Sequence, residues 1–375
     1  MESDDLYDRL CSFENLELAY QKARKHKTLK KYVIEFEKDL VSNLEQLRTE
    51  LMLHSYAPKP LINFIVRDPK TRKISKSDFR DRVIHHALCN IIEPMFDKSF
   101  IHDSFANRLN KGSLKALERF DEFKRKVSMN NTRRCYVLKA DIKKYFDEVD
   151  HDVLINIIKN KVKDNRIMWL VRKIISNRAI DSQVGGGATR QKSMPLGNLT
   201  SQFFANVYLN ELDQFVKHEL NVKYYIRYVD DFVILHQDEN ILKEYQNKIN
   251  EFLRNKLLIE LHPQKCKITE LNRGVAFLGF RVFPNHRLLR KMNINKMKRK
   301  FVKFKLYYDS SKVDYDTIYD YFQGWLAYAM WANTYNLRKK LGKEIELAFP
   351  GEISEIELNR LEKHILVDMD ANLSK

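Results

Sequence analysis

The sequence is poor in the residues that mark linkers, membrane spans and disulfide frameworks. Only 10 glycines and 8 prolines occur among 375 residues, which argues against long disordered linkers. No run of about eighteen apolar residues is present, and segment 1–8 is acidic and lacks the apolar core of a signal peptide. The four cysteines, Cys11, Cys89, Cys135 and Cys266, lie too far apart for a metal-binding pattern. These absences predict a cytoplasmic protein with reduced thiols and no membrane partner.

Acidic residues are outnumbered by basic ones. The chain has 67 Lys and Arg against 50 Asp and Glu, a net charge of +17, which favours a polyanionic partner such as nucleic acid. Two stretches, 22–31 (KARKHKTLKK) and 287–305 (RLLRKMNINKMKRKFVKFK), are rich in basic groups and contain no acid. Either could be a solvated helix face. The aromatic residues Phe301, Phe304 and Tyr307 in and beside the second stretch favour phosphate tracking with some base stacking.

The pattern of apolar residues predicts an α+β fold with its sheet in the middle of the chain. The first hundred residues are mainly helical apart from a short strand at 64–66, and the chain beyond the second basic stretch is helical again. The region 180–195 is expected to be a hairpin or loop. Between them we expect strands at 136–142, 267–269 and 276–282, a hairpin at 224–236, and helices at 151–162, from residue 201, and at 241–257.

The hairpin YYIRYVDDFVILH carries two adjacent carboxylates, Asp230 and Asp231, between two strand-forming runs. A tight turn accepts aspartate readily, so an acidic hairpin tip is one interpretation. The other is a metal site, because the strand YVLKADI delivers Asp141 at its end and two neighbouring strands would bring these side chains together. Three carboxylates in one cleft repel one another unless hard divalent cations neutralise them. Two Mg²⁺ ions are expected there, with Mn²⁺ as the alternative.

Five segments resemble the successive palm motifs of reverse transcriptases, in the same order: KADIKKYFDEVDHDVL, MPLGNLTSQFFANVYLNELD, IRYVDDFVILH, LHPQKCKI and VAFLGFRV. FRDRVIHHAL and SFANRLNKGSLKALERF are similar to the fingers, and FQGWLAYAMWANTYNLRK to the thumb. The resemblance covers roughly residues 40 to 340 and implies a right-hand polymerase fold. Its expected parts are an N-terminal helical extension (1–50), fingers (51–135, with 161–190 interleaved), a palm with an antiparallel sheet (136–285) and a helical thumb (286–375).

One motif points to a subtype. In PLGNLTSQ, Leu196 precedes Gly197 and Gln202 follows Ser201, which resembles the enzymes of bacterial and phage diversity-generating retroelements. Those enzymes copy a template RNA with errors at adenines. Phage-defence reverse transcriptases of the abortive-infection or retron-like type share the architecture and remain an alternative, as does a non-catalytic RNA-binding scaffold. No maturase extension is visible after the thumb, which weakens a group II intron protein.

The resemblance assigns the chemistry to a small acidic group. Asp141 and Asp230 match the two metal-bridging carboxylates, Asp231 is adjacent, and the carbonyl of Ile142 is a further candidate ligand. Lys265 matches a lysine that protonates the leaving pyrophosphate, although a surface cation is an equally good interpretation.

A dNTP site is implied next to these residues. Phe146 matches the aromatic gate whose ring crowds a ribose 2′-hydroxyl and favours dNTPs; packing in the core is its alternative. Lys73, Arg80 and Arg82 are candidate triphosphate ligands or solvated charges. The other expected contacts of the nucleotide are Leu196, Gly197 and Gln202.

The remaining assignments concern the nucleic acid. Segment Phe277, Leu278, Gly279 and Phe280 resembles the primer grip, where a β-turn braces the primer end. Trp325 and Trp331 are more typical of a helix core than of stacking platforms. Template RNA and the RNA/cDNA duplex are the expected macromolecular partners, together with a small basic accessory protein or a structured noncoding RNA. The residues expected to contact the backbone are Arg290, Lys291, Lys298, Arg299 and Lys300.

Overall fold

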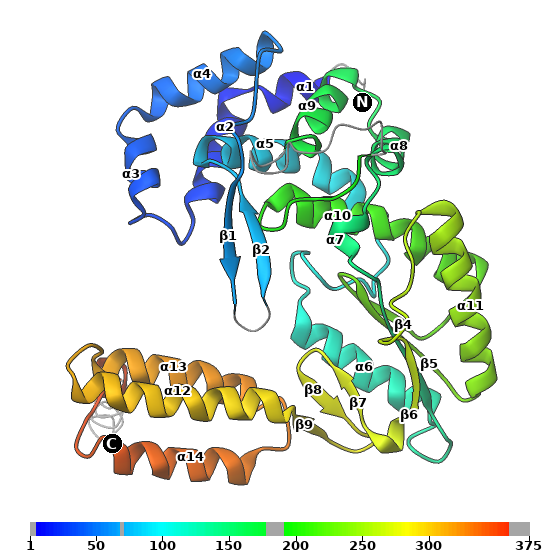
Figure 1. The fold of residues 1–375 in the computed structure, drawn as a ribbon, viewed down its shortest axis with the longest axis vertical. Helices are drawn as coiled ribbons and strands as arrows, with labels where there is room; N and C mark the ends of the chain where they lie inside the picture. The colour runs from blue at the N-terminus through cyan, green and yellow to red at the C-terminus, as the bar shows by residue number, and fades with distance from the viewer. Residues whose placement is uncertain (1–4, 68–70, 178–190, 360–375) are drawn as a thin grey trace, which may run out of the picture. The chain divides into compact units, whose positions relative to one another are not determined.

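The computed structural model describes residues 5–67, 71–177 and 191–359 (Figure 1). It confirms the predicted α+β class. The backbone forms two compact units: residues 1–123 with 136–268, and residues 124–135 with 269–375. The four-part division at residues 50, 135 and 285 stays a prediction, whereas the structure groups 269–285 with the C-terminal helices. Most of the expected loop at 180–195 lies outside the described residues.

A four-stranded sheet with the strand order β4-β5-β3-β6 forms the centre of the first unit, and β5 is antiparallel to both β3 and β4. Strand β3 pairs with β5 from Tyr136↔His236 to Asp141↔Asp231, and β4 pairs with β5 from Tyr225↔Ile234 to Tyr228↔Asp231. Both faces of β5 are buried over Phe232–Leu235, which explains its continuous apolar run. The strands are β3 (Tyr136–Asp141), β4 (Tyr225–Tyr228), β5 (Asp231–His236) and β6 (Lys267–Glu270), of which β6 crosses into the second unit.

Most helices of the first unit share one apolar core with this sheet. Helix α11 packs on β3 and β5, and α10 packs against α5 and α8 (Figure 1). Helix α10 runs on into a π-helical turn at Phe215–Glu219. The helices are α1 (Asp5–Leu10), α2 (Phe13–Arg24), α3 (Lys31–Glu37), α4 (Leu40–Met52), α5 (Phe79–Asp97), α6 (Ser113–Val127, which crosses a unit boundary), α7 (Tyr145–Glu148), α8 (His151–Lys161), α9 (Asn165–Ile175), α10 (Leu199–Gln214) and α11 (Glu239–Lys256).

A separate antiparallel hairpin, β1 (Ile62–Val66) and β2 (Arg72–Lys76), projects from the helices of the first unit (Figure 1). Strand β2 is fastened to the loop that leads into α10, because the amide of Ser75 donates to the carbonyl of Leu196 at 2.8 Å. The buried Asn198 adds bonds to the Ser75 carbonyl and to the amide and hydroxyl of Ser77. Gly197 permits this approach, since it has φ +114° and a Cβ there would lie 2.7 Å from Ile74 Cγ2.

The second unit contains a small sheet and three helices that lie together in Figure 1. The single strand expected at 276–282 is wrong: the chain turns back at Leu278 and Gly279 and forms two strands. Its elements are β7 (Val275–Phe277), β8 (Phe280–Val282), β9 (Arg287–Leu289), α12 (Lys291–Asp309), α13 (Tyr315–Ala329) and α14 (Tyr335–Ala348). The three helices share a core that includes Met297, Phe304, Ile318, Phe322 and Leu341.

None of the helices in the described ranges is long and apolar enough to cross a membrane. None of the four cysteines, all of them within the described ranges, forms a disulfide, and three of them are buried.

Candidate active site

The ends of two neighbouring strands bring the predicted carboxylates together. Asp141 ends β3 and stands opposite Asp231, the first residue of β5, while Asp230 occupies the two-residue turn between β4 and β5. A pocket of about 590 Å³ is lined by all three of these aspartates, Ile142 and Lys265. The structure therefore collects every residue of the predicted catalytic and metal group at one edge of the sheet.

The electrostatics of this pocket reflect crowded negative charge. Burial, followed by the nearby charge of Asp141, raises the pKa of Asp230 to about 6. Burial also raises the pKa of Asp231, although Lys139 Nζ lies 3.4 Å from Asp231 Oδ2 and opposes the shift. The Lys265 ammonium contacts Asp141 Oδ2. The raised pKa values and the two lysine contacts both indicate that the three aspartates are stabilised by added positive charge.

The donor set fits a hard divalent ion that shares its ligands with a substrate. Ile142 forms an antiparallel bridge with Leu261 in which the flanking residues make the hydrogen bonds, so the carbonyl of Ile142 points away from Leu261. Among the described residues, no three carboxylate, imidazole or thiol groups converge closely enough to enclose a metal alone. Mg²⁺ is commonly bound by one or two carboxylates plus substrate phosphates and water, so Asp141 and Asp230 suit it.

The β1–β2 hairpin offers a different cation to this pocket from the one expected. Arg72 lines the acidic pocket, whereas Lys73 lines a second pocket of about 260 Å³ on the other side of the strand. Successive residues of a strand face opposite sides, which accounts for the separation. Arg72 is therefore a candidate triphosphate ligand that sequence reasoning missed.

The nucleotide contacts implied by the resemblance are dispersed. Phe146 is half-buried and packs against the main core beside Tyr145, which itself lines the acidic pocket. Leu196 lines the second pocket together with Lys73, and Gln202 is exposed on α10. The expected positions of Asp141 and Asp230 thus converge, while those of Leu196 and Gln202 lie outside the acidic pocket.

Two arginines of α5 are engaged by protein groups. Arg80 forms an ion pair with Glu50 and lies 5.7 Å from the centre of the Tyr56 ring. Arg82 donates from Nε to the carbonyl of Ser77 at 3.0 Å, and its guanidinium lies 5.0 Å from the centre of the Tyr32 ring. Neither arginine is among the residues that line the acidic pocket.

In the second unit, the segment matched to the primer grip forms the turn between β7 and β8. Phe277 and Phe280 are paired, and the two turn residues Leu278 and Gly279 have φ of 43° and 93°. Such a pair of positive φ angles matches a tight type I′ hairpin turn.

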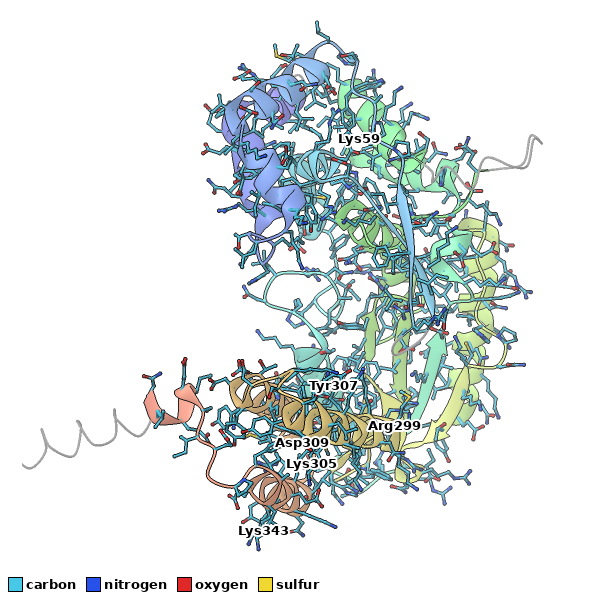
Figure 2. All side chains as sticks on the ribbon, turned by 60° about the vertical axis from the view of Figure 1, so that its left-hand side comes forward. Lys59, Arg299, Lys305, Tyr307, Asp309 and Lys343 are labelled. Carbon is cyan, nitrogen blue, oxygen red and sulfur yellow. The ribbon has the colours of Figure 1, made fainter. Side chains whose placement is uncertain are left out.

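The second basic stretch lies mainly on α12. Met297 and Phe304 face the core of the unit, whereas Lys291, Lys298 and Lys305 are exposed at seven-residue spacing and so follow one side of the helix. Figure 2 labels two basic residues of α12, Arg299 and Lys305. Arg290 and Arg299 are exposed as well, whereas the Lys300 ammonium lies 4.3 Å from the Phe304 ring centre. Trp325 packs against the core, as expected, and the Arg287 guanidinium lies 5.9 Å from the Trp331 ring.

A family model described as "Reverse transcriptase (RNA-dependent DNA polymerase)" matches residues 63–282. Protein YkfC of Escherichia coli is 26% identical over 287 residues, which cover 67% of this chain and 72% of that protein. Group II intron-encoded protein LtrA of Lactococcus lactis is 24% identical over 294 residues, and the putative COX1/OXI3 intron 2 protein of Saccharomyces cerevisiae is 22% identical over 302. The matches to the two intron proteins cover 60% and 64% of this chain, but 47% and 34% of those proteins. A truncated apo telomerase of Candida tropicalis superposes with a TM-score of 0.48, 13% identity, and coverage of 64% of this chain and 59% of that one.

Proposed function

Because the chain belongs to the reverse transcriptase (RNA-dependent DNA polymerase) family, we propose that it copies a template RNA into cDNA by nucleotidyl transfer with two divalent ions. The observation that carries this proposal is the pocket in which Asp141 and Asp230 meet beside Lys265. A non-catalytic RNA-binding scaffold would have no need of closely spaced carboxylates, one of which has its pKa raised to about 6.

Each residue of the pocket has a separate role in the proposed reaction. Asp141 and Asp230 would hold two Mg²⁺ ions, and the chemistry that these ions would supply is activation of a 3′-hydroxyl and stabilisation of the charge on the leaving pyrophosphate. Lys265 donates its proton to that pyrophosphate, and its contact with Asp141 keeps the ammonium at the site beforehand. Arg72 binds the triphosphate from the hairpin side. The ring of Phe146 excludes the ribose 2′-hydroxyl and selects dNTPs.

The direct test is extension of a DNA primer annealed to an RNA template by the purified chain. We expect incorporation that requires Mg²⁺ or Mn²⁺, uses dNTPs in preference to rNTPs, and is lost in EDTA. Retained RNA binding without any incorporation across these metals would favour the scaffold instead.

For the biological role we propose error-prone copying as part of a diversity-generating retroelement, with a small accessory protein or structured RNA as partner. Its support is the sequence Leu196-Gly197 with Gln202, and an aliphatic side chain at 196 has no directional contact with which to penalise a mismatch. The test is to sequence cDNA made by wild type and Leu196→Gln on one template. A marked fall in errors opposite template adenines is expected for the Gln variant, and identical error spectra would contradict the role of Leu196.

A further inference from the structure

The turn formed by Val229 and Asp230 between β4 and β5 is called the acidic turn below. Arg227 lies beneath it and is fully buried. Its Nε and Nη2 donate to the two oxygens of Asp213 at 2.8 and 2.6 Å, a bidentate pair. Its Nη1 donates to Asn206 Oδ1 at 3.1 Å and to the carbonyl of Val229, also at 3.1 Å. One guanidinium therefore connects helix α10, which carries Asn206 and Asp213, to the residue that precedes Asp230.

The turn that receives this bond has an unfavourable backbone conformation. Val229 has φ 56°, in the left-handed region that β-branched residues avoid. A residue held there costs about 1–3 kcal/mol and persists only when its surroundings fix it. The hydrogen bond from Arg227 to the Val229 carbonyl is such a restraint.

The arginine is itself held from several sides. Its backbone amide donates to the carbonyl of Asp103, and its carbonyl accepts from the amide of Phe105, both at 3.0 Å. The hydroxyl of Tyr225 donates to Asp213 at 2.8 Å and so supports the other half of the ion pair. Burial alone would lower the pKa of Arg227, but the carboxylate of Asp213 outweighs burial and keeps that pKa above its ordinary value. The guanidinium is consequently charged at any pH at which the protein is folded.

We propose that Arg227 is a positioning residue, which works with Asp213 and Asn206 to fix the Val229–Asp230 turn so that Asp230 meets Asp141 in a metal-binding arrangement. This inference rests on the proposed function, because it gives the turn its purpose. Removing the restraint lets Val229 relax to an ordinary φ, and the carboxylate of Asp230 then rotates away from the pocket.

A purely structural role is the competing explanation. Buried ion pairs add little stability compared with apolar residues of the same volume, although removing one partner alone typically costs about 3–5 kcal/mol. The two roles separate in a double variant, Asp213→Leu with Arg227→Met, which removes both charges and leaves no buried ion without a partner.

The experiment measures Mn²⁺ binding by electron paramagnetic resonance, without dNTP or nucleic acid, in wild type, Arg227→Lys and the double variant. We expect both variants to remain folded by circular dichroism and to bind Mn²⁺ at least about tenfold more weakly. In primer extension kcat should fall at least about tenfold, with the KM for dNTP within about threefold. Tyr208→Phe is the matched control, since it removes a buried hydrogen bond of α10 to the Leu257 carbonyl and should leave Mn²⁺ binding unchanged.

Three results would overturn the inference. The first is wild-type Mn²⁺ affinity in a folded Arg227→Lys or double variant, and the second is an equal loss in Tyr208→Phe. The third is failure of both variants to fold, which would show that the pair serves the fold. Asp230→Asn separates this failure from failure of the proposed function: if it also leaves Mn²⁺ binding unchanged, the metal site itself is not where we propose it.

Discussion

The structure contains two hairpin turns of the same length that are held in different ways. In the first unit, Val229 and Asp230 connect β4 to β5, and the Val229 carbonyl accepts from the fully buried Arg227. In the second unit, Leu278 and Gly279 connect β7 to β8. The Gly279 carbonyl accepts from three neutral groups: Asn293 Nδ2 at 3.2 Å, the Tyr328 hydroxyl at 3.3 Å and the backbone amide of Arg290 at 3.4 Å.

The difference follows from what each turn carries. The first presents a carboxylate that two other aspartates repel, so its backbone must resist an electrostatic force. A charged, bidentate anchor in a buried site is stiff enough to do so. The second carries no ionisable side chain, and half-buried neutral donors suffice. The two turns therefore share their length and differ in the charge of the group that holds them.

Of the changes predicted here, Asp230→Asn in the first turn should have the largest effect, a loss of dNTP incorporation. This change removes a proposed metal ligand from the acidic turn, and we expect dNTP incorporation to fall by about 10²-fold or more while RNA binding persists. Primer extension and a filter-binding assay measure the two quantities. Asp238→Asn is the matched control, because asparagine also caps a helix such as α11 and activity should not change. Near-normal extension by Asp230→Asn would refute the assignment.

Opposite substitutions at the two turns should have unequal effects on stability. In Gly279→Ala the new Cβ meets the Tyr328 side chain at φ +93°, and we expect a loss of about 1–3 kcal/mol in the free energy of unfolding. Val229→Gly relieves an unfavourable φ and should stay within about 1 kcal/mol of wild type. Denaturant unfolding followed by circular dichroism measures both. Equal destabilisation would mean that the Val229 conformation is not strained.

The acidic turn should also make stability depend on pH. The pKa of Asp230 is raised from 3.8 to about 6 in the folded chain, so the folded state binds its proton more tightly than the unfolded state. Ionised Asp230 therefore costs stability increasingly as the pH rises from about 4 to 6, and the full cost, at most about 3 kcal/mol, applies above 6.

In EDTA, Asp230→Asn should consequently melt at a higher temperature than wild type at pH 8, and the difference should shrink toward pH 4. Leu278→Asn on the neutral turn should show no such trend. A melting-temperature difference that does not vary with pH would contradict the raised pKa.

The smallest effect concerns nucleic-acid affinity and the second unit. Replacing Lys291, Lys298 and Lys305 by Gln removes three exposed charges from one side of α12. If they contact phosphates, binding should weaken for all sequences, and the slope of log K against log salt should flatten by up to about 3 units. Fluorescence anisotropy across a salt series gives the slope.

Three exposed lysines of α11 provide the control for that experiment: Lys243, Lys248 and Lys256, the first two paired with Glu239 and Glu244. Their replacement by Gln should leave the slope unchanged. The same flattening in both triple variants would indicate a general charge effect and no specific track on α12.

Sequence reasoning located the carboxylates because they stand at the ends of regular apolar strand patterns, and the resemblance to reverse transcriptases favoured a metal site over an acidic hairpin tip there. It placed β3, β5, α8 and α11 to within a few residues for the same reason, since their apolar periods are long and regular. It predicted Lys73 and not Arg72 as a triphosphate ligand. Successive residues of a strand face opposite sides, and the local sequence does not show which of the two sides of β2 faces the acidic pocket. The single strand expected over 276–282 was wrong, although the resemblance of Phe277 to Phe280 to a primer grip implied a β-turn at that place, and the chain does turn there.

Arg227 shows a different limit. An arginine within the strand-forming run YYIRYV was visible in the sequence as a charge among apolar neighbours. Its partner Asp213 lies fourteen residues earlier, on a helix whose packing against the hairpin is a tertiary fact. The apolar periodicity of a sequence describes one helix or strand at a time. It therefore cannot show that a residue of a strand, such as Arg227, pairs with a residue of a helix, such as Asp213.

The hydrogen bonds of Asn198 connect the β1–β2 hairpin to the acidic turn through one helix. They fasten β2 to the start of α10, and Asn206 and Asp213 further along that helix grip Arg227 and, through it, the Val229–Asp230 turn. Helix α10 thus connects the β1–β2 hairpin to the Val229–Asp230 turn through side-chain hydrogen bonds at its start and further along it. If Arg72 binds a triphosphate as proposed, a displacement of the hairpin would reach the Val229–Asp230 turn through α10, and loss of the Asn198 or Arg227 hydrogen bonds would uncouple nucleotide binding from the carboxylates.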